Sequence, residues 1–424
     1  MRIVKGTLAI AIYFVLQYNS SMKARYQYRI YPTDQQRQSL AQLFGCVRVV
    51  WNDALAFCQA KYRNGEKKPN NSELSKRLTQ IKKNEEKIWL GEVSAIPLQQ
   101  SLRDFDQAYS NFFQSCNGER KGKKLRPPKF KRRKSKQSAR FTSNGFTINQ
   151  HNVTLPKIGK LDIVWSRPLP SEPSSVTVIK DSAARYFLSF VVEITPEILP
   201  DNGKAIGIDL DITDFATFND GEKVKSTKPL KKCLKKLKRL QRQLSKTKKG
   251  SNRREVARKK VARLHAKISD TRKDFLHKLS TRVIRENQTI ALEDLNVLGM
   301  VKNRKLSRTI SDLGWRSFRE MLTAKAQKYG RDLRVIDRWE PTSQKCSCCG
   351  EKGGKKELKI REWACFFCGT LHDRDINASQ NILNVAVGHT ETKNGRRRKC
   401  KTTAKVAVSS DASTTFKPVQ LSLF

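Results

Sequence analysis

The sequence of 424 residues has no run of 18 or more apolar residues, so it offers no candidate membrane-spanning helix and we expect no membrane partner. It is also poor in acidic residues, with 39 Asp and Glu against 86 Lys and Arg and a formal net charge of +47. A chain of this charge repels itself unless it meets a polyanion, and nucleic acid is the polyanion that fits best. Hydrophobic residues make up 38%, too many for a disordered chain, so the length predicts two or three domains with packed cores.

Residues 1–21 differ from the rest of the chain. They combine a basic start with a nine-residue apolar run, Leu8–Leu16, which is typical of a secretory signal peptide. Export conflicts with the high positive charge and with reduced cysteines in metal spacing. We therefore interpret residues 1–21 as an N-terminal extension before Met22, and we expect a cytoplasmic, nucleoid-associated protein. A mature chain starting at Ser20 or Ser21 would instead indicate a cleaved signal.

Four cysteines near the C-terminal end have the spacing of a zinc ribbon. Two C-x-x-C pairs lie fifteen residues apart, and a glycine, Gly350 or Gly369, follows each pair. Glycine lets the backbone turn tightly, so that both thiolates of a pair can reach one ion. The alternative is four unrelated reduced thiols, and we expect Cys348 to be a bystander. The predicted Zn²⁺ ligands are Cys346, Cys349, Cys365 and Cys368.

The first part of the chain predicts one strand, several helices and then more strands. Residues 23–32 alternate as a strand does, Pro32 ends the strand and Thr33 can cap a helix. Apolar residues then recur at helical spacing from Leu40 to Leu55, and Gly45 is expected to break this segment into two helices. Further helices are predicted at 73–86 and 98–113. Short strands with turns at 143–145 and 159–160 predict a small β-barrel or sheet within 141–200.

Residues 118–140 form a basic segment in which 12 of 23 residues are Lys or Arg. Pro127 and Pro128 argue against a helix. Because Phe130 and Phe141 flank the basic run, and aromatic rings stack on bases, we predict a loop that contacts nucleic acid. The alternative is a solvated linker. The predicted contacts are Lys129, Lys131, Arg132, Arg133 and Lys134.

The following residues predict an α/β domain. A buried strand at 205–208 precedes a hairpin with its turn at 219–221. Residues 228–285 predict an antiparallel helical hairpin that carries 23 Lys and Arg against three acids, so its outer face is predicted to lie on phosphates through Lys235, Arg239 and Arg242. A merely charged coiled coil is the alternative. A strand at 289–292, a helix at 315–329, a strand at 333–337 and a helix within 372–387 complete the pattern.

Three carboxylates are predicted to stand at the ends of elements. Asp209 follows one strand, Glu293 ends another, and Asp375 lies in the first turn of a helix. Such residues can converge at one edge of a sheet, where two divalent cations about 4 Å apart would need hard oxygen ligands. A single Asp at a strand end is more often a turn or cap residue. The pattern alone therefore gives a candidate Mg²⁺ site.

Several strings resemble motifs of the TnpB (OrfB) proteins of insertion sequences. GIDLDITDFATFNDG at 207–221, IALEDLNV at 290–297 and HDRDINASQNIL at 372–383 resemble the three RuvC-type motifs of that family. The segment RWEPTSQKCSCCG with the later CFFCGT resembles its zinc ribbon. The opening KARYQYRIYPTDQQ and the string PKFKRRKSKQSARF also resemble the family. The resemblance extends from about Met22 to Val387.

The resemblance implies a multidomain α/β fold: an N-terminal wedge-like β-barrel domain with a helical insertion, then an RNase H-like RuvC domain with a basic helical hairpin and an inserted zinc ribbon. The wedge-like domain would comprise 22–48 and 126–200, and the helical recognition insertion 49–125. The nuclease core would comprise 204–345, with the basic hairpin at 228–285. The ribbon at 346–370, the last core motif at 371–389 and a disordered tail at 390–424 would follow.

The resemblance also implies an RNA-guided, Mg²⁺-dependent DNA endonuclease of a mobile element, similar to type V CRISPR effectors. Its partners would be a guide RNA and target double-stranded DNA. Asp209, Glu293 and Asp375 would hold two Mg²⁺ ions, and Asp373 is an alternative for the third position because the string DRD offers both. Zn²⁺ would be structural.

One residue departs from the family pattern, since Asp211 stands where the family usually has glycine. Its charge could crowd Asp209 or add a metal ligand. A catalytically inactive DNA- and RNA-binding regulator of the mobile element is therefore the alternative function. The five histidines include no His-hydrophobe-His pair, which counts against a tyrosine transposase that joins strands itself.

Overall fold

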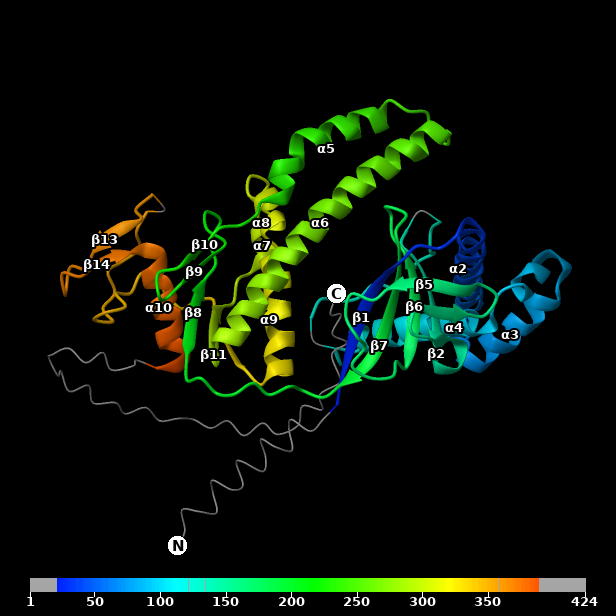
Figure 1. Cartoon of the computed structure of the whole chain (residues 1–424), viewed down its shortest axis with the longest axis horizontal. Helices are drawn as coiled ribbons and strands as arrows, with labels where there is room; N and C mark the ends of the chain where they lie inside the picture. The colour runs from blue at the N-terminus through cyan, green and yellow to red at the C-terminus, as the bar shows by residue number, and fades with distance from the viewer. Residues whose placement is uncertain (1–20, 121, 134, 358, 389–424) are drawn as a thin grey trace, which may run out of the picture. The chain divides into compact units, whose positions relative to one another are not determined.

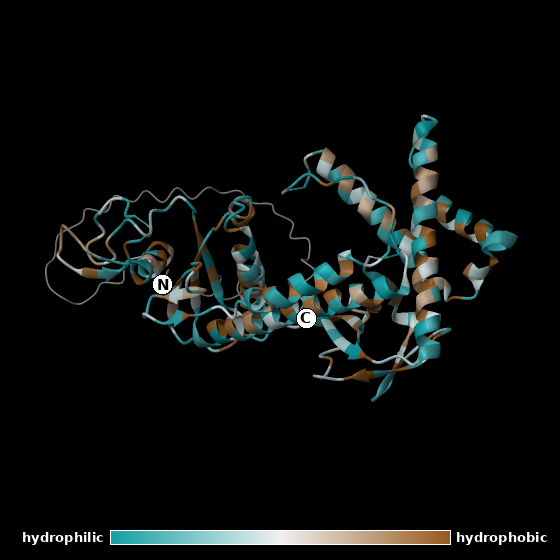
Figure 2. Cartoon of the chain, turned by 90° about the horizontal axis from the view of Figure 1, so that it is seen from above, coloured by the Kyte–Doolittle hydropathy of each residue, from teal (hydrophilic) through white to brown (hydrophobic). Residues whose placement is uncertain are grey.

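The computed structural model describes residues 21–388 apart from 121, 134 and 358 (Figure 1). These residues belong to two compact units, 21–194 and 195–388. The expected extension, apart from Ser21, and the expected tail from residue 390 onward lie outside the described residues. The described helices mix hydrophilic and hydrophobic residues (Figure 2), and none of them is long and apolar enough to cross a membrane.

A seven-stranded antiparallel sheet forms the centre of the first unit, in the order β2-β6-β7-β1-β5-β4-β3. Its central pair joins β1 (Met22–Ile30) to β7 (Tyr186–Ile194) along their whole length. Residues of β1 alternate, so that Ala24, Tyr26 and Tyr28 face the core. The other strands are β2 (Gln137–Thr142), β3 (Thr147–Ile148), β4 (Asn152–Leu155), β5 (Gly159–Val164) and β6 (Ser175–Lys180).

The structure decides between the two forms expected for this segment, a small β-barrel or a sheet, and corrects one turn. The edge strands β2 and β3 do not pair with each other among the described residues, so the strands form an open half-barrel sheet. The turn expected at 159–160 precedes these residues, because Gly159 is already paired with Leu155 at the start of β5. The predicted turn at 143–145 is present as a 3-10 turn, Ser143–Gly145.

Helices inserted between β1 and β2 pack against this sheet and share its core. They are α2 (Asp34–Arg63), α3 (Asn71–Lys83), the 3-10 segment η1 (Glu85–Gly91) and α4 (Ala95–Cys116). Thr33 caps α2 as predicted, since its side chain accepts a hydrogen bond from the Gln36 N–H and its own N–H donates to the Gln36 side chain.

The predicted helix break at Gly45 is wrong, because α2 continues without interruption through this residue. The neighbouring side chains of Phe44 and Cys46 are buried in the core. Their packing outweighs the roughly 1 kcal/mol that a glycine costs inside a helix. The boundary expected between residues 48 and 49, from the wedge-like domain to its helical insertion, falls inside α2.

The second unit contains a five-stranded mixed sheet in the order β10-β9-β8-β11-β12. Strands β8 (Ala205–Asp209), β11 (Thr289–Glu293) and β12 (Asp332–Ile336) are parallel. Strands β9 (Ala216–Phe218) and β10 (Lys223–Val224) extend the sheet as an antiparallel hairpin. The predicted strands and the turn after Phe218 are confirmed within one or two residues.

Helices cover both faces of the mixed sheet. Ile206 and Ile208 pack in one cluster with α6 (Asn252–Glu286) and α9 (Trp315–Tyr329), the helix predicted at 315–329. The alternate residues face α10 (Arg374–Val387) on the other side. A Cβ added at Gly207 would lie 2.1 Å from the Ser379 carbonyl oxygen, so only glycine permits this close approach of α10.

The predicted helical hairpin is confirmed. Helix α5 (Pro229–Ser245) lies beside α6 (Figure 1), and a small apolar seam of Leu237, Leu264 and Ile268 joins them. The short helices α7 (Val297–Met300) and α8 (Ser307–Leu313) precede α9. Along the chain, a two-stranded sheet of β13 (Glu362–Ala364) and β14 (Leu371–Asp373) follows β12 and precedes α10, and β14 leads directly into α10.

Candidate functional site

The three predicted carboxylates come from elements that meet at one edge of the mixed sheet. Parallel pairing of β8 and β11 sets Ile208 opposite Leu292, so Asp209 and Glu293 follow at the same edge. Both residues alternate onto the face that α10 covers, because each lies two positions beyond a residue on that face, Gly207 or Ala291. Asp375 lies one helical turn before Ser379, the residue of α10 that approaches Gly207.

The electrostatics of Asp209 reflect this arrangement. The pKa of Asp209 is raised from 3.8 to about 8, first by burial and then by the charges of Glu293, Asp375 and Asp211 in that order. Burial also raises the pKa of Glu293, with a second contribution from the charge of Asp294. The site therefore holds more negative charge than the protein around it stabilises, which is the condition that a bound cation relieves.

Arg361 is a cation at this site that sequence reasoning missed. Its Nη1 atom lies 3.3 Å from both carboxylate oxygens of Asp375 and 3.5 Å from Oδ2 of Asp211, and its Nη2 lies 3.3 Å from the Thr213 hydroxyl. Burial raises the pKa of Asp375, and the Arg361 charge opposes that rise. Arg361 and Asp211 are 150 residues apart in the chain, so no local pattern signals their contact.

Asp373 has a separate structural role. Its Oδ1 accepts hydrogen bonds from the N–H groups of Asp375 and Ile376 at 3.0 and 3.1 Å, so it caps α10. Its Oδ2 lies 2.6 Å from the Lys223 ammonium. Burial alone would raise the pKa of the Asp373 carboxyl. The hydrogen bond from Lys223 and those from the two backbone N–H groups outweigh burial, so the pKa is lowered. Of the two acids in the string DRD, Asp373 thus caps the start of α10. The Asp375 carboxylate is not used as a helix cap.

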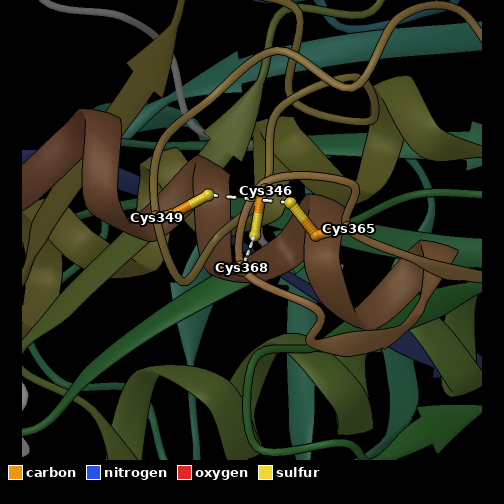
Figure 3. A group of neighbouring side chains, drawn as sticks. All are labelled: Cys346, Cys349, Cys365 and Cys368. Atoms are coloured by element: carbon orange, nitrogen blue, oxygen red, sulfur yellow. Dashed lines mark hydrogen bonds between the residues drawn. The ribbon is translucent and has the colours of Figure 1, made fainter.

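The four predicted cysteines lie together. Their sulfur atoms are all within 4.8 Å of one another, and their side chains point toward a common centre (Figure 3). Within the described ranges, no other set of three or more His, Cys, Asp or Glu has its ligand atoms this close together. The carboxylates of Asp209, Glu293 and Asp375 are therefore farther apart than the four sulfur atoms. Gly350 and Gly369 have φ of 78° and 70°, and their N–H groups donate to the carbonyls of Cys346 and Cys365, as expected for two metal-binding turns.

A histidine that sequence reasoning missed supports the cysteine cluster. His372 Nε2 lies 3.0 Å from the Cys346 sulfur, and the His372 ring lies 4.8 Å from the Trp363 ring. Cys346 and Cys365 are buried, whereas Cys348 is exposed and outside the cluster. Thiolates at this spacing suit Zn²⁺, and a histidine that donates to a ligating sulfur would hold it in place.

The predicted basic residues of α5 are on the surface. Lys235, Arg239 and Arg242 are exposed, and their spacing of four and three residues places them on one side of the helix. The seam residue Leu237 faces α6 instead. These three cations are therefore available to phosphates.

The basic loop between α4 and β2 is attached to α2. The Trp51 indole N–H donates to the Lys129 carbonyl at 3.1 Å, and the Asn52 side chain accepts from the Lys131 N–H at 2.8 Å. The Lys131 ammonium lies 3.7 Å from the centre of the Trp51 ring, and burial lowers its pKa. Of the other predicted contacts, Lys129, Arg132 and Arg133 are exposed, and Lys134 lies outside the described residues.

One argument used for this loop is wrong. Phe141 is fully buried in β2 and is part of the core, so it is not available to stack on bases. Phe130 is half exposed and keeps that option. A buried strand residue next to a basic run gives the same sequence pattern as a loop aromatic.

Three segments of the sequence match known families. Residues 189–304 match the IS605 OrfB family, described as a probable transposase, and residues 315–382 match the Cas12f1-like TNB domain. Residues 22–67 match a family described as a helix-turn-helix domain. In the structure this last segment is strand β1 followed by the single helix α2 and its C-terminal turn.

Whole-chain comparisons find similar proteins. A Streptomyces pristinaespiralis protein named putative RNA-guided DNA endonuclease is 45% identical over 380 residues, which cover 89% of this chain and 92% of that protein. The putative RNA-guided DNA endonuclease InsQ of Escherichia coli K12 is 31% identical, over 86% of this chain and 92% of its own. The fold resembles Cas12f1 in a cryo-EM complex with sgRNA and target DNA, with a TM-score of 0.53 and 12% identity over 86% of this chain and 99% of that one.

Proposed function

Because the chain belongs to the IS605 OrfB (TnpB) family, we propose that it is an RNA-guided DNA endonuclease of an insertion sequence. A guide RNA and target double-stranded DNA would be its partners, as the names of its relatives indicate for those proteins. Base pairing with the guide would select the target, while the protein holds the backbones and a short flanking duplex. We also infer that it acts in the cytoplasm at the nucleoid, where its DNA substrate lies.

The observation that carries the catalytic proposal is the raised pKa of Asp209, to about 8, at a sheet edge shared with Glu293 and Asp375. Hard carboxylate oxygens fit Mg²⁺, and we propose that these three residues hold two such ions. Bound Mg²⁺ would supply an activated water and stabilise the leaving oxygen of a phosphodiester. The mixed sheet, an antiparallel meander continued by two parallel strands, supports an RNase H-like, RuvC-type core.

The chain's own residues prepare this site in two ways. The Asp373 cap and its ion pair with Lys223 fix the first turn of α10, and so the position of the Asp375 backbone. Arg361 holds the Asp375 carboxylate through both oxygens and compensates part of the charge. Metal binding would then compete with Arg361 for the same oxygens.

The cysteine cluster is proposed to hold structural Zn²⁺ through Cys346, Cys349, Cys365 and Cys368. Only Gly369 and Thr370 separate Cys368 from strand β14, and β14 leads directly into α10. Folding of the zinc module would therefore help to place Asp375. The fit rests on four thiols within one coordination sphere and on His372 beside Cys346.

We assign the basic surfaces to nucleic-acid backbones. The exposed cations of α5 and of the loop at 129–133 are candidates for phosphate contacts. The first unit would correspond to the wedge-like domain and its helical insertion. The second would correspond to the nuclease core with its ribbon.

The proposal is tested by target cleavage with the cognate RNA. Asp209→Ala should lower the single-turnover rate by roughly three orders of magnitude or more, because one metal-binding carboxylate is lost. Asp274→Ala, which removes an exposed carboxylate on α6 of the same unit, is the matched control and should cut like wild type. Equal rates for wild type and Asp209→Ala would show that the site is assigned wrongly.

A second candidate is a regulator that binds nucleic acid and does not cut. The contact of Arg361 with Asp211 and Asp375 favours it, because a cation already occupies the carboxylate face. This candidate predicts guide-dependent DNA binding with no cut strands in Mg²⁺ or Mn²⁺. Cut target in either metal excludes it.

A further inference from the structure

A cavity of about 410 Å³ adjoins the carboxylate edge, within the second unit. Its volume lies in the range of about 300–1,000 Å³ that is usual for small-molecule sites. Glu293 belongs to both features, since it ends β11 at the carboxylate edge and also lines the cavity. A ligand in this cavity would therefore contact Glu293, one of the three acidic residues that we propose to act on DNA.

The apolar part of the wall comes from the segment after β11 and from the start of α9. Leu295, Leu298 and Trp315 contribute to it. Leu298 is 67% exposed, although it is a large aliphatic residue next to a strongly polar site. An apolar wall of this kind suits a planar ring more than a hydrated ion or a sugar.

The cationic part of the wall is preorganised. Arg319 and Arg338 both line the cavity, and both donate to the Asp294 carboxylate, which fixes their position. Arg316 also lines it and pairs with Glu320 at 2.9 Å. A guanidinium that is paired through its edge can still stack through its planar face. The cavity thus combines aliphatic and planar cationic surfaces, which match an aromatic ring attached to an anionic backbone.

We propose that this cavity binds one unpaired nucleobase of the DNA strand, that of the nucleotide adjoining the phosphodiester at the carboxylates. The inference rests on the proposed function and adds a subsite to it. A base can enter only when it is unstacked and unpaired, so the subsite selects a single strand. The preference for a base over other planar ligands follows from Glu293, which links the cavity to the cleavage site.

The test uses single-stranded DNA decamers that carry one abasic position, moved along the strand, with Ca²⁺ in place of Mg²⁺ and binding measured by fluorescence anisotropy. For wild type, an abasic site at one position should weaken binding by roughly tenfold, the usual effect of losing one stacked base. An abasic site at any other position should weaken binding by less than about twofold. Sequencing of the ends that wild type produces in Mg²⁺ should place this position next to the cut bond.

Two variants locate the effect. Leu298→Ala removes the exposed part of the wall with little loss of core packing, and Thr323→Phe fills the cavity from α9. Both should make all abasic positions equivalent. Val301→Ala, which trims a partly exposed residue of the same segment outside the cavity, should keep the wild-type pattern.

The outcomes separate this inference from the proposed function. Equal binding at every abasic position of wild type overturns the subsite, and so does an unchanged pattern in both Leu298→Ala and Thr323→Phe. If wild type cuts guided targets but shows no sensitive position, only the subsite is wrong. If one position is sensitive in wild type and lost in the variants, the subsite stands, even where no guided target is cut and the proposed function fails.

Discussion

Neutralising Asp209 should stabilise the protein in the absence of metal. The pKa of its carboxyl is about 8 in the folded chain and 3.8 in the unfolded chain, so between these pH values the folded state binds a proton more tightly than the unfolded state does. Stability contributed by this group is greatest below pH 4 and falls as the pH rises toward 8. Asp209→Asn removes this loss, because the amide carries no charge at any of these pH values.

The size of the effect follows from the shift. At pH 7 the folded Asp209 carboxyl is mostly protonated, and taking up this proton on folding costs at most about 4 kcal/mol, which is 1.36 kcal/mol for each of the roughly three pH units above 3.8. Solvent at the partly exposed edge screens some of this, so we expect about 1–3 kcal/mol. For a unit of this size each kcal/mol corresponds to about 2–4 °C in Tm, which gives a gain of about 2–12 °C.

The assay is thermal unfolding in EDTA at pH 4.5, 7 and 8.5. The Tm difference between Asp209→Asn and wild type should be small at pH 4.5 and grow with pH. Asp274→Asn, at an exposed carboxylate on α6, should show no such growth. Mg²⁺ should raise the Tm of wild type more than that of Asp209→Asn. A difference that stays constant with pH, or a wild type that is the more stable protein at pH 8.5, would refute the reasoning.

Three further predictions concern other parts of the chain. Cys365→Ala should abolish bound zinc, measured by mass spectrometry of the purified protein, and Cys348→Ala should retain one ion per chain; zinc retained in Cys365→Ala would contradict the ribbon site. Gly207→Ala should lower the free energy of unfolding by more than about 2 kcal/mol, because its Cβ would lie 2.1 Å from the Ser379 oxygen. Gly45→Ala, inside the uninterrupted helix α2, should raise the free energy of unfolding by about 0.5–1 kcal/mol. Denaturant titrations that rank the two variants in the opposite order would contradict the packing. Replacing Lys235, Arg239 and Arg242 together by Gln should weaken DNA or RNA binding and lower the salt slope of log K by about 3, and an unchanged slope would remove α5 from the interface.

The elements of the second unit could be predicted closely from the sequence because their signals are local. Helix α9 occupies 315–329 as its apolar spacing indicated, and β11 ends at Glu293. The cysteine cluster was predictable for the same reason, since ligand spacing and the two following glycines are written in short strings.

The errors arose where tertiary packing outweighs local preference. Gly45 does not interrupt α2, because the residues on either side are buried in a core shared with the sheet. The open edge between β2 and β3 could not be predicted, because strand pairing is decided by contacts distant in sequence. Phe141 was misread because a buried strand residue and a loop aromatic have the same neighbours in the sequence.

The missed site residues, Arg361 and His372, have no motif of their own. Arg361 acquires its role only when the zinc module folds beside β8 and α10. His372 acquires its role when β14 pairs with β13 and brings the ring to Cys346. Local strings can therefore nominate ligands, whereas residues that support those ligands emerge from the fold.

The most direct measurement is the position of Mn²⁺ bound to the wild-type protein with guide RNA and target DNA, located by anomalous scattering from crystals of the complex. We predict two peaks about 4 Å apart between Asp209, Glu293 and Asp375. Manganese bound elsewhere, or no manganese at these three carboxylates, would contradict the account.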